Sequence, residues 1–84
     1  MTSTNESELE YRVVLSRDSE GNWLASVPAI PGCHTWGQSR KKALANAREA
    51  IEACLDSLSE TGEELPVSDL PVEVETVRIS HPAA

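Results

Sequence analysis

The chain lacks phenylalanine and has only three aromatic residues, Tyr11, Trp23 and Trp36, among 84. It also lacks a long apolar run, because its longest uncharged stretch, residues 21–39, is interrupted by prolines and glycines. A membrane-spanning helix needs about 20 consecutive apolar residues, so this stretch is not one. Residues 1–8 are polar and acidic and lack the basic and apolar regions of a secretory signal. We therefore expect a cytoplasmic protein that does not contact a membrane.

Cysteine is scarce as well. Cys33 and Cys54 could pair only once, and without an export signal we expect both to be reduced thiols. Together with His34 and His81 they show no paired ligand spacing such as C-x-x-C, so we predict neither a metal site nor a cofactor. Cys33 next to His34 resembles a nucleophile beside a base. Neighbouring strand residues point to opposite faces, however, so the pair is poorly placed to share a proton.

Positive charge is the third shortage, with seven basic residues against fourteen acidic ones and a net charge of −7. This balance opposes nonspecific binding to nucleic acid, whose affinity comes largely from neutralising phosphates. It favours encounter with a basic partner, because complementary fields raise association rates. Solubility alone would explain the acidity equally well.

The length fits one domain with a marginal core, which favours at least a homodimer. We expect a polar flexible leader over residues 1–9, one domain over 10–80, a tail over 81–84 and no separate DNA-binding domain. The hydrophobic pattern predicts an α+β fold, an antiparallel sheet with one helix packed on one face, in the order β-β-β-α-β. The strands are expected at Glu10–Arg17, Trp23–Val27, Cys33–Gln38 and Val72–Ile79, the last of them bulged or at an edge because its alternation slips at Glu75–Val77.

The helix is expected over residues 40–60. Ser39 is a suitable N-cap residue, and Gly62 lies where a helix commonly ends. Apolar side chains recur at spacings of three and four, which places them on one stripe, whereas the charged residues point to water. The apolar stripe comprises Leu44, Ala47, Ile51, Cys54, Leu55 and Leu58, and the charged residues are Arg48, Glu49, Glu52 and Asp56.

Three stretches together resemble the HicB family of bacterial antitoxins. The first is Tyr11–Leu15 (YRVVL) with the turn Asp18–Trp23, and the second is Ser26–Cys33 (SVPAIPGC). The third is Gly37–Ser39 (GQS) followed by Ala43–Ile51 (ALANAREAI). The resemblance covers roughly residues 11–66. The chain departs from the family's pattern at residues 40–42, where three cations replace the acids that commonly open this helix.

The resemblance implies a partial RNase H-like fold that binds and neutralises a small, basic, mRNA-cleaving HicA-type toxin. The mechanism would be steric and electrostatic, with no bond made or broken. The alternative is a stand-alone HicB-fold protein without a toxin, which binds another protein, or nucleic acid or an anion through the basic helix start. Direct DNA binding is not expected without a partner.

An enzyme with an RNase H-like fold would need several carboxylates converging on its sheet to hold divalent metal. The first predicted strand has no acid at its centre, and Glu73 and Glu75 alternate with valines as a solvated face would. We therefore predict no catalytic activity and no catalytic residue.

Two sets of residues remain as candidate contacts. Ser39, Arg40, Lys41 and Lys42 place three cations in a first helical turn, against the macrodipole, and they are either tolerated surface charges or a partner or anion site. Pro28, Ile30, Pro31 and Trp36 form a candidate interface loop, since rigid prolines lower the cost of ordering and tryptophan is enriched at interfaces. The loop could equally be a structural turn, and both tryptophans could pack in the core.

Overall fold

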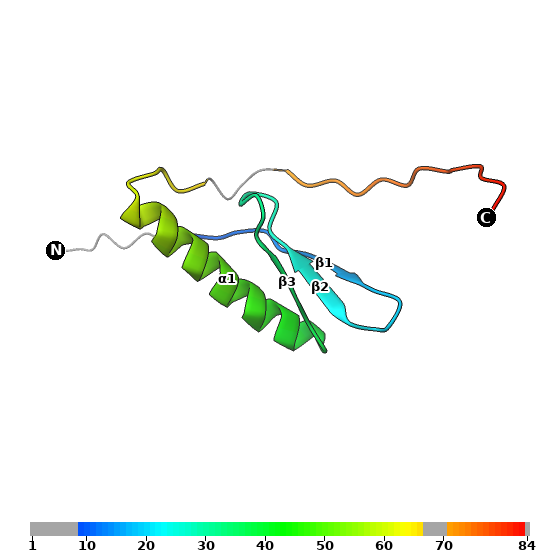
Figure 1. Cartoon of the computed structure of the whole chain (residues 1–84), viewed down its shortest axis with the longest axis horizontal. Coiled ribbons are helices and arrows are strands. Elements are labelled where there is room, and N and C mark those ends of the chain that lie inside the picture. Colours follow the sequence, from blue (N-terminus) through cyan, green and yellow to red (C-terminus); the bar gives the residue numbers. More distant parts are fainter. Residues whose placement is uncertain (1–8, 67–70, 84) are drawn as a thin grey trace.

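The computed structural model describes residues 9–66 and 71–83 of the chain. Three short strands come first, β1 (Val14–Arg17), β2 (Trp23–Ser26) and β3 (His34–Gly37), and one helix, α1 (Arg40–Glu60), follows. The strands form an antiparallel sheet in the order β1-β2-β3, and α1 crosses one face of it (Figure 1). The predicted α+β fold with one helix on an antiparallel sheet is therefore confirmed. Among the described residues no helix has the length and hydropathy of a membrane span.

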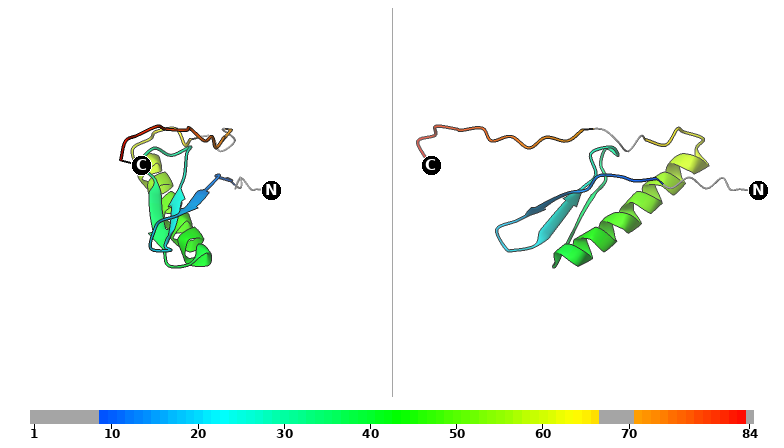
Figure 2. Two further views of the ribbon diagram at one scale, coloured as in Figure 1. Left: turned by 90° about the vertical axis from the view of Figure 1, so that its right-hand side faces the viewer. Right: turned by 180° about the vertical axis from the view of Figure 1, so that it is seen from behind.

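The predicted fourth strand is the one element that differs. Residues 71–83 are extended and exposed, but they belong to no strand. They leave the body of the molecule as an arm, which Figure 1 and the right-hand view of Figure 2 show. A strand needs a neighbour to accept and donate its backbone hydrogen bonds, and this segment lies beside none. The predicted leader over residues 1–9 lies almost wholly outside the described residues.

The turn between β1 and β2 is built by one carboxylate. The Asp18 side chain accepts hydrogen bonds from the backbone N–H groups of Glu20 and Asn22, both at 2.9 Å, and Gly21 takes a positive φ of 89°. This local network explains why the sequence DSEGN reverses the chain. Across the turn, the Arg17 guanidinium stacks 4.8 Å from the centroid of the Trp23 ring.

The turn between β2 and β3 is a structural element of the core. Gly32 has a φ of 81°, as its position after Pro31 predicted. The backbone N–H of Val27 donates to the carbonyl of Cys33, and that of Cys33 donates to the carbonyl of Ile30. Val27, Ile30 and Cys33 are each at most 4% exposed and pack together under the C-terminal half of α1. The turn therefore sets the strand register and also contributes core side chains.

Helix α1 has the boundaries that its capping residues predict. The Ser39 hydroxyl accepts from the Lys42 backbone N–H at 3.1 Å. At the other end Gly62 has a φ of 77°, and the N–H groups of Gly62 and Glu63 donate to the carbonyls of Ser59 and Leu58. This pair of bonds is a Schellman motif, which satisfies carbonyls that a helix end leaves free.

The helix lies unusually close to β3, because Gly37 has no side chain. A Cβ atom at Gly37 would lie 2.5 Å from the Ala43 backbone nitrogen and 2.9 Å from its Cα. Ala43 and Ala47 face the sheet and are at most 1% exposed, and they pack with Ala25 of β2. The core at this end consists of small side chains because the backbones themselves are close together.

Candidate functional site

The strand register places the two tryptophans on opposite faces of the sheet. Trp23 pairs with Gly37, and Leu24 pairs with Trp36, so successive rows alternate between faces. Trp23 is half-buried and packs against the core beneath α1. Trp36 lies on the face away from the helix, where it is 53% exposed beside the 39% exposed Leu24. Trp36 is therefore available to a partner, whereas Trp23 is not.

The candidate interface loop is divided by burial. Pro28 and Pro31 are exposed, and Ile30 is 4% exposed within the core. Ile30 therefore serves packing, and only the two prolines and the more distant Trp36 present surface. The structure does not bring these residues together as one continuous contact surface, because Trp36 lies on the open face of the sheet.

The basic helix start has the predicted geometry. Ser39 caps the helix, and Arg40, Lys41 and Lys42 are all exposed. Lys42 also borders a shallow hollow of about 310 Å³ together with Trp36 and Asn46. The Asn46 side-chain amide donates to the Trp36 carbonyl at 2.8 Å, which ties the helix to β3. One residue of each candidate set, Trp36 on β3 and Lys42 on α1, therefore borders this hollow.

An acidic surface at the opposite end of α1 is the largest feature that sequence reasoning missed. Glu52, Asp56 and Glu60 follow each other at intervals of four, so they lie on one line along the helix. All are exposed, and residues 49–64 contain six acids and no lysine or arginine. The acidic stripe, as this surface is called below, comprises Glu49, Glu52, Asp56, Glu60, Glu63 and Glu64. The i, i+4 spacing was the sequence signal that could have identified it.

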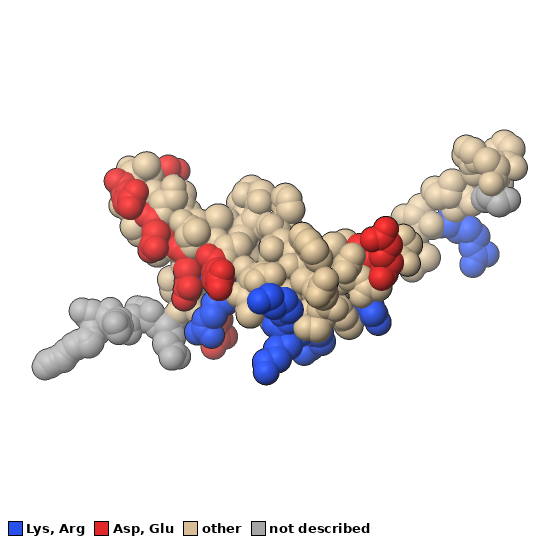
Figure 3. Space-filling model, turned by 60° about the horizontal axis from the view of Figure 1, so that its bottom comes forward, with Lys and Arg blue, Asp and Glu red and all other residues tan. Residues whose placement is uncertain are grey.

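The charges of α1 therefore run against its macrodipole at both ends. Its first turn holds three cations and no acid, and its last turn holds an acid and no base. Each such charge costs about 0.3–1 kcal/mol at an exposed helix end. Figure 3 shows the separation, with red side chains over the region of the helix's C-terminal half and blue ones near its other end. An ion pair between Arg48 and Glu52, at 3.8 Å, joins the two regions, and it is solvent-exposed and weak.

The cysteines and histidines are not arranged for catalysis or metal binding. Cys33 is buried and the adjacent His34 is exposed, as the alternation of a strand requires. Cys33 instead packs against Cys54 of α1. Burial, and next the neighbouring Cys54 thiol, raises the pKa of Cys33, which disfavours a thiolate nucleophile. Within residues 9–66 and 71–83, no three His, Cys, Asp or Glu side chains converge on a common point as metal ligands.

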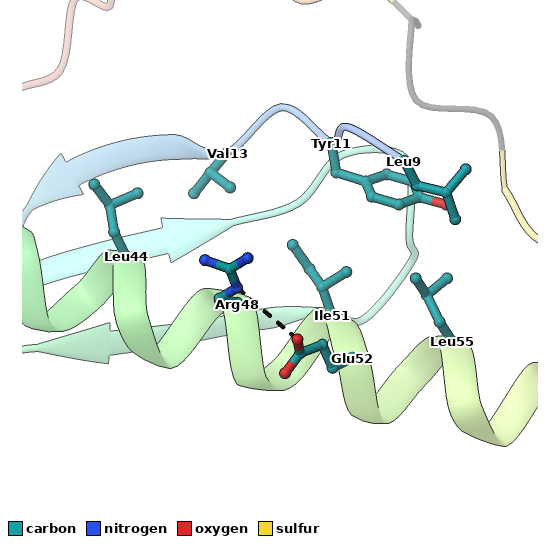
Figure 4. Close-up of a pocket in the computed structure, with 8 residues that line it drawn as sticks. All are labelled: Leu9, Tyr11, Val13, Leu44, Arg48, Ile51, Glu52 and Leu55. Atoms are coloured by element: carbon teal, nitrogen blue, oxygen red, sulfur yellow. Dashed lines mark ion pairs between the residues drawn. The ribbon is translucent and has the colours of Figure 1, made fainter. Parts of the chain in front are cut away.

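A hollow of about 330 Å³ lies between α1 and the chain that leads into β1 (Figure 4). Tyr11, Val13 and Leu44 line it from both sides, with Ile51 and Leu55 further along the helix. Arg48 and Glu52 also border it, so its walls are partly apolar and partly charged. The Tyr11 hydroxyl donates to the Pro66 carbonyl at 2.7 Å and holds the segment after the helix against its end.

The sequence of this chain is similar to those of known proteins. The model of a family described as the HicB-like antitoxin of bacterial toxin-antitoxin systems matches residues 11–81. A UPF0150 protein of Thermoplasma acidophilum is 41% identical over 58 residues, which cover 69% of this chain and 84% of the relative. A UPF0150 protein of Synechocystis is 34% identical over 73 residues, 87% of this chain and 92% of the relative.

One solved structure agrees with the fold as well. The N-terminal domain of the antitoxin HicB of Burkholderia pseudomallei superposes with a TM-score of 0.58 at 33% identity, over 76% of this chain and 69% of that one. The family match extends over most of the strands, the helix and the C-terminal arm described above. The chain belongs to the HicB-like antitoxin family.

Proposed function

We propose that the chain is an antitoxin module that binds a small, basic, mRNA-cleaving toxin of the HicA type in the cytoplasm and blocks its active surface. Family membership supports an antitoxin, and the acidic stripe supports a basic partner. The stripe is the observation that carries the proposal. Six carboxylates on one surface, two of them in like-charged i, i+4 pairs with Asp56, weaken the helix that holds them.

A surface that lowers the stability of its own helix requires a compensating role. Solubility would be served by acids placed anywhere on the surface, including the first turn of α1, where they would stabilise the helix. The chain has cations at that end and acids at the other. The resulting field is strongest over the C-terminal half of α1, where the negative end of the macrodipole adds to the side-chain charges. A basic protein would be attracted to this side of the molecule.

The mechanism needs no chemistry from this chain. The stripe would attract the toxin's basic RNA-binding surface, and the bound antitoxin would then exclude mRNA by occupying that surface. Electrostatic attraction of this kind raises the association rate and weakens as salt screens the charges. Complex formation is therefore expected to be slower at high ionic strength.

The test is a charge reversal that stabilises the antitoxin while it weakens the complex. Asp56→Lys with Glu60→Lys turns the repulsive Glu52–Asp56 pair into an attractive one and leaves a like-charged pair, now two lysines, at positions 56 and 60. It also places a cation in the last helical turn, so the variant should unfold at equal or higher denaturant concentration. Its dissociation constant for the toxin should rise at least tenfold. It should likewise fail to protect an mRNA substrate at concentrations where the parent chain protects it.

The matched control carries the same change in net charge elsewhere. Glu10→Lys with Glu20→Lys alters two exposed acids outside the stripe. Its dissociation constant should stay within about threefold of the parent value, because only the long-range field changes. Equal weakening by both variants would show that net charge, and not the stripe, governs binding.

A second surface would serve the alternative function, that of a stand-alone HicB-fold protein without a toxin. Trp36 and Leu24 lie on the open face of the sheet, away from the stripe, and Trp36 is next to Lys42. A stand-alone HicB-fold protein that binds another partner through the basic helix start would depend on this region. If Trp36→Ala or Lys42→Glu abolished partner binding while the stripe variant kept it, the stand-alone function would replace the antitoxin.

A further inference from the structure

The C-terminal arm exposes apolar side chains to solvent. Val74, Val77 and Ile79 are 85%, 75% and 70% exposed, and Val72 is 39% exposed. The backbone of residues 71–80 is extended throughout, outside any sheet. The arm therefore has the conformation and the composition of a strand that lacks its partner.

The same chain has an open sheet edge, and a hollow with apolar side chains, Arg48 and Glu52 in its walls lies next to the chain that leads into this edge. β1 is an edge strand with β2 on one side, so its other side is open among the described elements. Helix α1 packs chiefly on β3 and β2, which leaves Leu44, Ile51 and Leu55 only partly covered opposite residues 9–13, the chain that leads into β1. These three side chains line the hollow in Figure 4 with Tyr11 and Val13. A strand added next to β1 would lay alternate side chains into this hollow.

The arm's sequence matches such a position. In a regular strand Val72 and Val74 would point to one face, and Val77 and Ile79 to the other. One extra residue, a β-bulge at Glu75–Thr76, brings all four apolar side chains to the same face. Glu73, Arg78 and Ser80 then point to water. Bulges are common in edge strands, and this strand would be the new edge of the sheet.

The dimensions of the molecule indicate a second copy as the occupant. The molecule extends 63 Å along its long axis but only 25 and 22 Å across it. The arm leaves the body in Figure 1 and in the right-hand view of Figure 2, and residues 72–79 in extended form reach about 26 Å. That length is sufficient to cross a neighbouring body of the same size.

We propose that residues 72–79 pair with the outer edge of β1 in a second copy of the chain and fill its hollow with Val72, Val74, Val77 and Ile79. The exchange is reciprocal, so each body receives the fourth strand that the sequence encodes. The buried residues of one body are small, Ile30 being the bulkiest, and the exchanged strand would enlarge this core in both copies. Glu52 of the acidic stripe borders the hollow, but the other five carboxylates of the stripe do not line it, so most of the stripe stays accessible in the dimer.

The first experiment measures the mass of the full chain in solution by sedimentation equilibrium. The parent chain should be a dimer at micromolar concentrations. Val77→Glu should raise the dimer dissociation constant roughly 30-fold or more, because it puts a charge into the apolar hollow. Ser80→Glu adds the same charge to the same arm on the outward face and should change the constant less than threefold. Both variants leave the described core untouched, so both should keep the parent's helical circular dichroism.

The second experiment separates exchange from folding back onto the same chain. Leu44→Glu blocks the hollow but leaves the arm intact, and Val77→Glu does the reverse. Each variant alone should be monomeric, whereas an equimolar mixture should form heterodimers, in which the intact arm of one enters the intact hollow of the other. A parent chain that is monomeric would overturn the proposal. A mixture that stays monomeric would overturn it too, because arms that fold back onto their own chain cannot enter the hollow of another copy.

Discussion

Gly37 is predicted to be the position where one methyl group costs most stability. In Gly37→Ala the new Cβ would lie 2.5 Å from the Ala43 backbone nitrogen and 2.9 Å from both Ala43 Cα and the Lys42 carbonyl carbon. Ordinary contact begins at 3.4 Å, so α1 must move away from β3 by nearly 1 Å. The neighbouring atoms are backbone, and no side-chain rotation can relieve the overlap.

The size of the stability loss depends on the packing contacts between α1 and the sheet that this movement loosens. A gap of 0.5–1 Å forfeits about a quarter to a half of the dispersion energy of the atoms along it. The affected contacts include those of Ala43 and Ala47, which are fully buried against β3 and β2. Overpacking of this kind costs about 1–3 kcal/mol, and we expect the upper end because the clash is with backbone. A chain of this length has about 4–13 kcal/mol of stability in total, so the loss is a large fraction.

The assay is urea unfolding followed by circular dichroism and tryptophan fluorescence at one fixed protein concentration, since any self-association makes stability concentration-dependent. The comparison position is Gly62, where a Cβ meets nothing within 4 Å but φ is +77°. Its cost is conformational, about 1–2 kcal/mol, and should be similar for Ala and Lys. At Gly37 the cost should grow from Ala to Leu. Equal costs for Ala and Leu at Gly37 would refute the close-contact argument.

Three further predictions concern single groups. Ser39→Ala should lower the free energy of unfolding by about 1 kcal/mol in urea melts, because the Lys42 backbone N–H loses its capping acceptor. Ser39→Asp should restore the lost stability, and an unchanged stability in Ser39→Ala would contradict the capping role. Slight desolvation raises the pKa of Asp18, but hydrogen bonds from Asn22 and Glu20 outweigh it and hold the pKa below its ordinary 3.8. The stability that Asp18 contributes is therefore present above about pH 4 and is lost as the pH falls through its lower folded pKa. In Asp18→Asn the free energy of unfolding should therefore fall less steeply with acidification. An unchanged acid dependence would count against the turn network. Thiol labelling should modify the half-exposed Cys54 before the buried Cys33, whose pKa is raised, and rapid native-state labelling of Cys33 in a Cys54→Ser variant would show that the core is open.

The local sequence signals predicted most of the fold because each of them acts within a few residues. The Ser39 cap, the apolar stripe and Gly62 determine where α1 begins and ends, and the structure has those limits. The strands were predicted in the right places but too long, since pairing ends where the two turns divert the backbone. The final strand could not be settled in this way. Its pattern is that of a strand, but a strand also needs a neighbour, and none of the described strands pairs with it.

The candidate site was less predictable, because it depends on register and burial. The sequence indicated that Trp23 and Trp36 lie on neighbouring strands but not which rows they share, and a shift of one residue exchanges their faces. Ile30 resembled a loop residue and is core, because the turn folds back over the end of α1. The acidic residues were individually visible as exposed charges. Their role as one continuous surface appears only when Glu63 and Glu64, beyond the helix, are counted with those on it.

The most direct test of the antitoxin function is a tagged pull-down of the full chain from its native host, with the co-purified proteins identified by mass spectrometry. The Asp56→Lys, Glu60→Lys variant and the Glu10→Lys, Glu20→Lys control are expressed in parallel. We predict that the parent and the control recover the same small basic protein in stoichiometric amount and that the stripe variant recovers much less of it. Recovery of the chain alone, or equal recovery of that protein by all three, would contradict the account.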